Sequence, residues 1–281
     1  MNFDRFLHRT LGRPYRLHAA VHGDAAKPVI VLLHGIAASS QDWSKLIPLL
    51  EPYYRCVTID LLGFADSPKP QWASYTMEDH GRAIEYTIRK LGIGGPFMLV
   101  GHSLGSLLAT DYARRHQDNV ERLLLLSPPV YPPLHAISDK LALRRTNLLL
   151  NIYKFLRTNP RVTLENVKRL ALILPLSRSI TKFPDTWLPF FRSLEHCIEQ
   201  QTIIQDIKDI AAPIDVFYGT LDTVVVGENV RALGRLRDVT FHQFAGNHQL
   251  SARYAKVVAK VLLPQQPANK RRLPNVLEII R

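Results

Sequence analysis

Cysteine is scarce in this chain, and the shortage excludes one class of protein. Among 281 residues there are only two cysteines, Cys56 and Cys197. Two thiols cannot form the set of bridges that stabilises small disulfide-rich secreted domains. A chain of this length with 46% hydrophobic residues buries enough apolar surface to fold without such bridges. We therefore expect two free thiols and a reducing compartment.

The chain also lacks features of membrane insertion and of metal binding. No uncharged apolar run approaches the ~18 residues of a membrane span, and residues 1–9 lack the continuous apolar segment of a secretory signal. We expect a cytoplasmic protein. Histidine, cysteine and carboxylate residues nowhere cluster at the spacing of a metal site. The sequence therefore predicts no metal and no other cofactor.

Positive charge is in excess, but it is dispersed. The net charge is +12, and the excess is spread over residues 1–20, residues 128–210 and a short cluster at 270–272. No nucleic-acid-binding motif accompanies this charge, so no nucleic-acid partner is expected. Because residues 128–210 are both basic and rich in Leu, contact with a membrane surface stays open, although a solvated surface is favoured. The oligomeric state is not predicted.

Apolar runs of strand length alternate with longer helical patterns through most of the chain. Strand patterns occur near 15–22, 28–33, 55–59, 97–101, 122–126, 214–218 and 238–244, and helical patterns near 39–50, 76–91, 103–116, 224–236 and 250–262. This alternation predicts an α/β fold, a doubly wound and mostly parallel sheet flanked by helices.

The alternation is interrupted at residues 128–211, where the patterning is helical. A segment of this length is too long for a structureless loop in a compact domain. We therefore predict an inserted helical cap over a catalytic domain formed by residues 1–127 and 212–263, followed by a basic tail at 264–281. Within the cap, two segments are rich in Leu and Ile, 148–156 and 164–174. They are expected to pack mainly as core, and the alternative is that part of their surface lines an acyl pocket or contacts lipid.

One pentapeptide carries most of the functional information, Gly101-His102-Ser103-Leu104-Gly105. It follows the apolar run 97–100 and opens the helical stretch 106–113. Glycines on both sides allow a sharp turn between strand and helix, which lifts the Ser103 hydroxyl off the sheet at the helix N-terminus. This is the context of a nucleophile elbow. The alternative is a purely structural turn.

A serine hydroxyl is a weak nucleophile at neutral pH and needs a general base that is oriented by a third group. Asp222 lies in the loop after the strand pattern 214–218, and His248 lies in the loop after 238–244. The carboxyl ends of parallel strands meet at one edge of a sheet. We therefore expect Ser103, Asp222 and His248 to converge there.

Other residues compete for these two roles. His242 lies within a strand pattern, where the pleat fixes the direction of its side chain. Asp60 precedes the serine in the chain, and Asp215 lies inside a strand. Two further histidines have simpler interpretations, since His34 is expected to hold its own loop and His102 to act as a spacer beside the serine.

With these residues placed, the chain resembles the α/β-hydrolase family over about residues 14–263. His34-Gly35 looks like the family's oxyanion loop, and residues 60–67 look like its Asp-x-x-Gly-x-Gly-x-Ser loop. Two positions depart from the pattern. Ala65 replaces the usual second glycine, and Ser106 replaces a glycine common after the elbow. Both residues are small, so we expect modest changes in backbone freedom and no loss of chemistry.

The resemblance implies a role for each matching residue. Ser103 would be the nucleophile, His248 the general base and then acid, and Asp222 the carboxylate that orients the imidazole. The backbone N–H groups of Ile36 and Leu104 would form the oxyanion hole. In the cap, three aromatic residues are candidate walls of a substrate pocket, Trp187, Phe190 and Phe191.

The implied function is a serine hydrolase that cleaves a small-molecule carboxylic ester through a covalent acyl-enzyme. One alternative uses the same triad for carbon–carbon bond hydrolysis or for cofactor-free perhydrolase or haloperoxidase chemistry. Another is a non-catalytic ligand-binding protein on the hydrolase fold. Serine at position 103 argues against the haloalkane dehalogenase and epoxide hydrolase branches, which use Asp there. The acyl and alcohol groups are not predicted.

Overall fold

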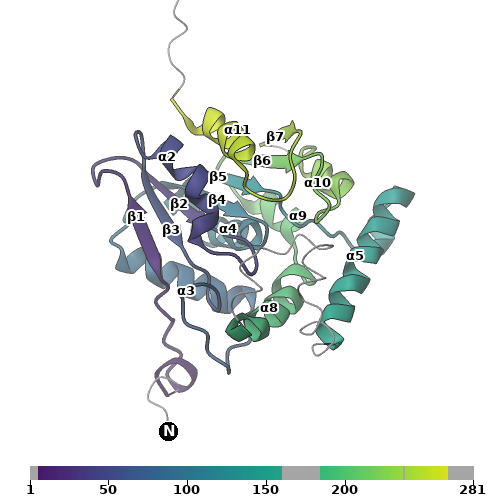
Figure 1. Cartoon of the computed structure of the whole chain (residues 1–281), viewed down its shortest axis with the longest axis horizontal. Helices are drawn as coiled ribbons and strands as arrows, with labels where there is room; N and C mark the ends of the chain where they lie inside the picture. Colours follow the sequence, from purple (N-terminus) through teal and green to yellow (C-terminus); the bar gives the residue numbers. More distant parts are fainter. Residues whose placement is uncertain (1–5, 160–183, 237, 265–281) are drawn as a thin grey trace, which may run out of the picture.

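A seven-stranded sheet forms the centre of the computed structural model, which describes residues 6–159, 184–236 and 238–264 (Figure 1). The strand order is β1-β3-β2-β4-β5-β6-β7. The strands are β1 (Ala19–His22), β2 (Val29–Leu33), β3 (Arg55–Ile59), β4 (Phe97–His102), β5 (Val120–Leu126), β6 (Ile214–Gly219) and β7 (Val239–Phe244). Edge strand β1 runs antiparallel to β3, and every other neighbouring pair is parallel. The predicted mostly parallel sheet is confirmed.

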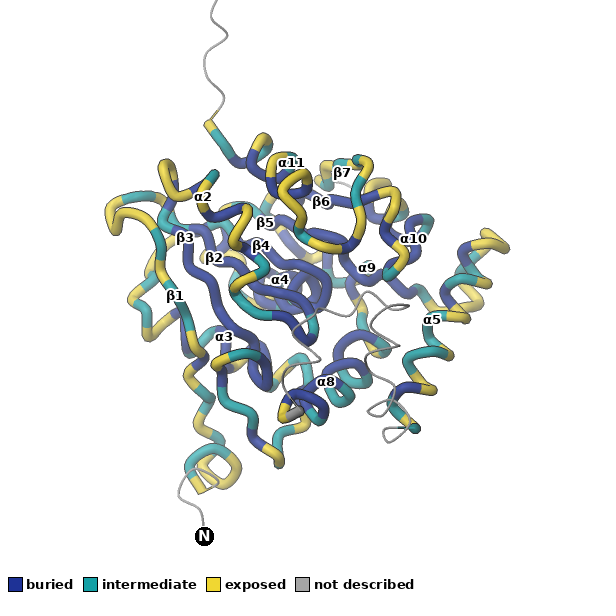
Figure 2. Tube along the Cα trace, in the orientation of Figure 1, coloured by how far each residue is buried: buried dark blue, intermediate teal, exposed yellow. Residues whose placement is uncertain are grey.

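Helices cover both faces of this sheet. Alternate residues of β2 show the two layers, since Val31 and Leu33 belong to one buried cluster and Ile30 and Leu32 to the other. The first cluster includes side chains of α3 (Met77–Lys90), α4 (Leu104–Arg115) and α10 (Gly227–Leu233), and the second those of α2 (Ile47–Leu50) and α11 (Ala252–Leu262). Because both faces are buried, the central strands are nearly continuous apolar runs (Figure 2).

Local signals set several helix boundaries. Thr76 caps α3 through a reciprocal pair of hydrogen bonds with Asp79, and the Ser251 hydroxyl accepts from Tyr254 N–H to cap α11. The single helix predicted over 39–50 is wrong in detail. It is divided into a 3-10 helix, Ser40–Lys45, and α2. Pro48 has no N–H for a continuing helix but fits the first turn of a new one.

Between β5 and β6, all regular elements of the described residues are helical. The main ones are α5 (Lys140–Thr158), α8 (Trp187–Ser193) and α9 (Ile203–Asp206). Helix α9 contacts α4, and buried residues near it, such as Cys197 and Ile203, belong to the same core cluster as the sheet. The second half of the predicted cap therefore shares the core of the main domain, whereas α5 lies at the edge of the molecule (Figure 1). The predicted segment 164–174 and the tail from residue 265 lie outside the described residues.

The two cysteines are buried and free. Burial raises the pKa of the Cys56 thiol to about 11 and also raises the pKa of Cys197. The prediction of two free thiols is confirmed. Across the described ranges, none of the helices combines the length and apolar character required to cross a membrane.

Candidate active site

Ser103 lies at the tight junction between β4 and α4. Its backbone angles, φ +52° and ψ −119°, fall in a region that non-glycine residues seldom occupy. A hydrogen bond from Ser103 N–H to Leu126 O (2.9 Å) holds the turn against β5. The flanking glycines are sterically required, because a Cβ at Gly101 would collide with the carbonyl of Gly105, and one at Gly105 with the carbonyl of Leu33. The local geometry is that of a nucleophile elbow.

The two departures from the family pattern have visible consequences. The Ser106 hydroxyl lies 2.8 Å from Gly101 O and 3.2 Å from Leu126 O, so it donates a hydrogen bond back to the elbow. Ala65 adopts φ +46°, the left-handed conformation that glycine would occupy at no steric cost. The loop therefore keeps its backbone shape with alanine, at a cost of about 1–2 kcal/mol.

The structure pairs Asp222 with His248. His248 Nδ1 lies 2.8 Å from Asp222 Oδ2, and both residues are buried. Since a carboxylate only accepts, Nδ1 carries the proton, which leaves Nε2 to accept one. The second oxygen of Asp222 accepts from the N–H groups of Val224 (2.9 Å) and Val225 (3.3 Å). Burial alone would raise the pKa of Asp222, but His248 and the hydrogen bond from Val224 N–H hold it below its usual value.

Backbone contacts bring the two loops together. Thr220 N–H donates to Phe244 O and Leu221 N–H donates to Gly246 O, each at 2.9 Å. The approach is so close that a Cβ at Gly219 would collide with the carbonyl of Gly246. The loop after β6 is thereby bound to the loop after β7, and the Asp222–His248 hydrogen bond follows from this contact.

His102 connects the elbow to the His248 loop. Its Nε2 lies 2.8 Å from the carbonyl oxygen of His248, and the two imidazole centroids are 4.9 Å apart. His102 is buried, which lowers its pKa to about 3, and the nearby His248 adds to this effect. Ser103 itself forms no hydrogen bond with His248. Catalytic hydrogen bonds are often long in unliganded enzymes and shorten when the substrate binds.

The predicted oxyanion loop lies against the elbow. A Cβ at Gly35 would be 3.2 Å from Ser103 Cβ. His34 holds this loop, since its Nε2 accepts from Leu61 N–H (2.9 Å) and its Nδ1 donates to Gly35 O (2.8 Å). Within the described ranges, the amides of Ile36 and Leu104 donate no hydrogen bond to the protein. Both amides are therefore left for a ligand oxygen.

The rival residues are engaged elsewhere. His242 Nε2 lies 2.7 Å from Asp215 Oδ1, and the other oxygen of Asp215 accepts from Arg122 Nε, also at 2.7 Å. Asp60 accepts from the backbone and the hydroxyl of Ser40 and from His18 Nδ1. The described residues thus contain three hydrogen-bonded His–Asp pairs, His248–Asp222, His242–Asp215 and His18–Asp60. Of the three histidines, His248 is the one hydrogen-bonded to the elbow, through His102.

Two residues near the pair escaped sequence reasoning. Ser127, at the carboxyl end of β5, approaches Asp222 and lies 3.2 Å from the Tyr254 hydroxyl. Asp42, in the 3-10 helix Ser40–Lys45, is partly buried, which raises its pKa to about 6, although its neighbour His248 opposes the rise. Ser127 could have been noticed from its place directly after a strand. Asp42 carries no signal, because only the fold brings it to His248.

A further cluster joins His18, just before β1, to two carboxylates of the loop 60–67. Side-chain atoms of His18, Asp60 and Asp66 lie within 4.8 Å of one another. Sequence spacing gave no sign of this group, because its members meet only across the folded loops. Asp60 already accepts hydrogen bonds from Ser40 and His18, so the cluster is explained as a structural connection between loops.

The three aromatic pocket candidates lie together on α8. Trp187 and Phe190 are buried in the main core cluster, Phe191 packs against it, and the three ring centroids are 5.5–5.9 Å apart. The surface has two clefts of about 670 Å³ and 370 Å³. Neither cleft is lined by these three aromatics or by a member of the proposed triad. The role of the three aromatics in binding substrate stays a prediction.

Comparisons with known proteins identify the fold. A family model described as alpha/beta hydrolase fold matches residues 28–164. Over 105 residues the chain is 36% identical to probable lysophospholipase BODYGUARD 4 of Arabidopsis thaliana, a match that covers 37% of this chain and 25% of that protein. Over 115 residues it is 36% identical to epoxide hydrolase 3 of Xenopus tropicalis, which covers 41% and 31%.

The structural similarity extends over more of the chain. A haloalkane dehalogenase loop variant from Bradyrhizobium elkanii superposes with a TM-score of 0.70 at 20% identity, covering 87% of this chain and 90% of that one. The sequence matches span only about a quarter to a third of the two curated relatives. The chain has the α/β-hydrolase fold.

Proposed function

We propose that the protein is a serine hydrolase that cleaves a carboxylic ester. The observation that carries the proposal is the 2.8 Å contact between Asp222 and His248 in a loop joined to the Ser103 elbow. A neighbouring carboxylate fixes the imidazole tautomer and stabilises imidazolium, as a serine nucleophile requires. The relative named probable lysophospholipase supports ester chemistry. Ser103 stands where the epoxide hydrolase and dehalogenase branches use aspartate, which argues against their reactions.

The reaction follows from the placement of these groups. His248 Nε2 accepts the Ser103 hydroxyl proton as Oγ bonds to the ester carbonyl carbon. The carbonyl oxygen becomes an oxyanion, and the Ile36 and Leu104 amides donate to it. Collapse of this intermediate breaks the bond to the alcohol, which leaves with the proton from His248. Water, deprotonated by His248, then attacks the acyl-enzyme and releases the acid and free Ser103.

Within the predicted cap, residues 128–211, helix α8 is assigned to acyl recognition. The segment lies between β5 and β6, whose carboxyl ends carry Ser127 and the Asp222 loop. Phe191 on α8 is half-buried, so it is the aromatic best placed to contact a substrate without being essential to the core. Each methylene buried in such a pocket contributes about 0.8 kcal/mol. Phe191→Ala should therefore weaken the preference for longer acyl chains.

A fluorophosphonate label and a series of p-nitrophenyl esters test the proposal. The label should form one adduct on the Ser103 peptide, and Ser103→Ala should abolish both labelling and ester turnover. Ser106→Ala is the matched control. It removes a buried hydroxyl from the same helix and should leave the Ser103 adduct in place. An adduct elsewhere, or none on folded wild-type protein, would contradict the proposal.

A further inference from the structure

Helix α5 presents an unusual outer face. Of its 19 residues none is acidic and five are basic. Three large apolar side chains on it are more than half exposed, namely Leu141 (58%), Leu148 (60%) and Phe155 (51%). Single exposed apolar residues are common on soluble proteins, but these three share one line along the helix.

The spacing of the three residues produces this line. Positions seven apart on an α-helix differ by only about 20° around the axis, so Leu141, Leu148 and Phe155 form a nearly straight stripe. At 1.5 Å per residue the stripe is roughly 21 Å long. Exposed Lys140, Arg144 and Lys154 flank it. Figure 2 shows α5 at the edge of the fold, with most of its length exposed or partly buried.

The cations of α5 fall into two groups. On the side facing the protein, Arg145 pairs with Glu228 (3.2 Å), and Arg157 pairs with Glu195 (2.8 Å) and Glu199 (3.4 Å). On the outer face, Lys140, Arg144 and Lys154 pair with no carboxylate among the described residues. The nearest acid along the chain, Asp139, accepts hydrogen bonds from the amides of residues 141 and 142 as the helix N-cap. The outer face therefore combines an apolar stripe with uncompensated positive charge.

We infer that the outer face of α5 is a docking surface for an anionic lipid membrane. A helix with Leu and Phe along one line and Lys and Arg beside it lies in the headgroup region, where the apolar side chains enter the acyl boundary and the cations meet lipid phosphates. A second copy of the chain fits less well, because two such faces would bring like charges together without a carboxylate between them. The inference does not depend on the proposed ester chemistry.

Vesicle co-sedimentation tests the inference with the full chain. The wild-type protein should bind vesicles that contain phosphatidylglycerol and should not bind pure phosphatidylcholine vesicles. High salt should weaken the binding, because ions screen the charge. Leu148→Gln together with Phe155→Gln should lower the partition coefficient by roughly tenfold or more, since the stripe loses two inserted side chains. Arg144→Gln should lower it roughly fivefold.

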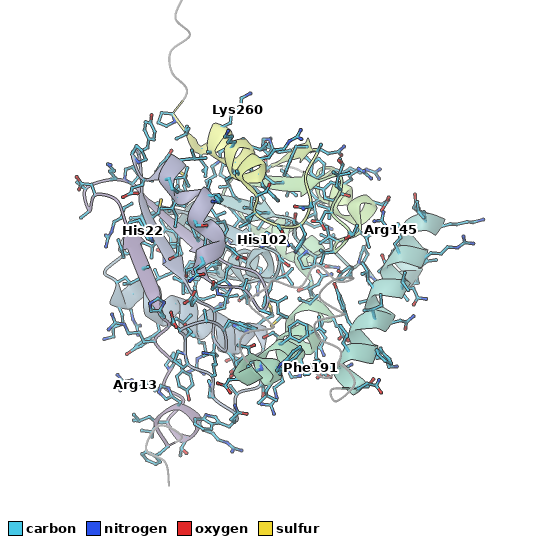
Figure 3. All side chains as sticks on the ribbon, in the orientation of Figure 1. Arg13, His22, His102, Arg145, Phe191 and Lys260 are labelled. Carbon is cyan, nitrogen blue, oxygen red and sulfur yellow. The ribbon has the colours of Figure 1, made fainter. Side chains whose placement is uncertain are left out.

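Matched controls separate this face from general surface effects. Tyr53→Gln removes a side chain of similar exposure (47%) from the turn between α2 and β3, and α2 lies on the opposite side of the molecule from α5 (Figure 1). Lys260→Gln removes a cation from α11, far from α5 in Figure 3. Both variants should bind like wild type. Turnover of a soluble short-chain ester should be unchanged in every variant, which separates a failure of docking from a failure of the proposed reaction.

Three results would overturn the inference. The first is that the wild-type protein does not bind anionic vesicles, or that the α5 variants bind them as well as wild type does. The second is a wild-type dimer in light scattering that the double variant converts to a monomer, since the face would then bind a second copy. The third is a drop in melting temperature for Leu148→Gln typical of a core substitution, which would mean that the chain itself covers the stripe.

Discussion

The carbonyl oxygen of His248 accepts a hydrogen bond from Nε2 of His102, the residue directly before Ser103, at 2.8 Å. A carbonyl cannot donate, so His102 must carry its proton on Nε2. Its low pKa keeps the ring neutral, and its Nδ1 has no hydrogen-bond partner within the described residues. His102 is therefore a positioning residue, because its hydrogen bond fixes the His248 loop relative to the elbow.

Loss of this hydrogen bond should affect turnover more than binding. His102→Ala removes an interaction of about 1–1.5 kcal/mol, so kcat should fall roughly tenfold while KM for small esters changes little. His102→Gln, which can still donate, should recover part of the rate. His80→Ala is the control. His80 is equally buried and bonds to Ser193 Oγ at 3.0 Å, so its loss should lower stability and spare kcat. Equal kcat values in both alanine variants would refute the positioning role.

The His248–Asp222 and His242–Asp215 pairs should separate cleanly in kinetics. Asp222→Asn should lower kcat by about 10⁴ if its role is to fix the tautomer, by analogy with the serine-protease triad. His248→Ala should have at least as large an effect. Asp215→Asn and His242→Ala break the second pair and should leave kcat within a few-fold of wild type. Steady-state assays measure kcat for each variant, and circular dichroism confirms that each variant is folded. A large activity loss on breaking the His242–Asp215 pair would contradict the assignment of His248 as the general base.

The contact between the two loops predicts a steric effect at a glycine. Gly219→Ala would push a Cβ into the carbonyl of Gly246, which is backbone and cannot rotate away. We expect a destabilisation of about 1–3 kcal/mol and a fall in kcat as Asp222 and His248 separate. Gly95→Ala, whose Cβ meets no atom within 4 Å, should change neither by much. Chemical denaturation and kcat measured on both variants provide the comparison.

Asp42 should make stability depend on pH near neutrality. Its folded-state pKa of about 6 lies above the ordinary aspartate value of 3.8 because burial disfavours the charged form. Folding therefore favours protonated Asp42. This contribution is complete below about pH 4 and is lost as pH rises through about 6. Asp42→Asn should match wild type near pH 4 and exceed it at pH 8 by up to about 3 kcal/mol, as measured by urea unfolding.

Much of the fold could be predicted from the sequence, because its signals are local. Apolar runs of strand length predicted all seven strands, and β2 and β3 were predicted within a residue at each end. The sequence signal for the Ser103 turn is also local, since two flanking glycines and a following helix suffice to specify an elbow. The single helix predicted over 39–50 is instead divided in two, because Pro48 lacks the N–H that a continuing helix requires.

Tertiary structure decided which distant residues meet. Sequence order favoured His248 and Asp222 but could not show that His242 and Asp215 form a pair of their own, or that Asp42 lies beside His248. These contacts depend on the order of strands in the sheet and on the close approach of Gly219 to Gly246. The exposed stripe on α5 was likewise invisible in the sequence, where its Leu residues were expected to pack as core. The sequence determines the chemistry of each side chain, whereas the burial and the partners of that side chain depend on which surfaces pack together.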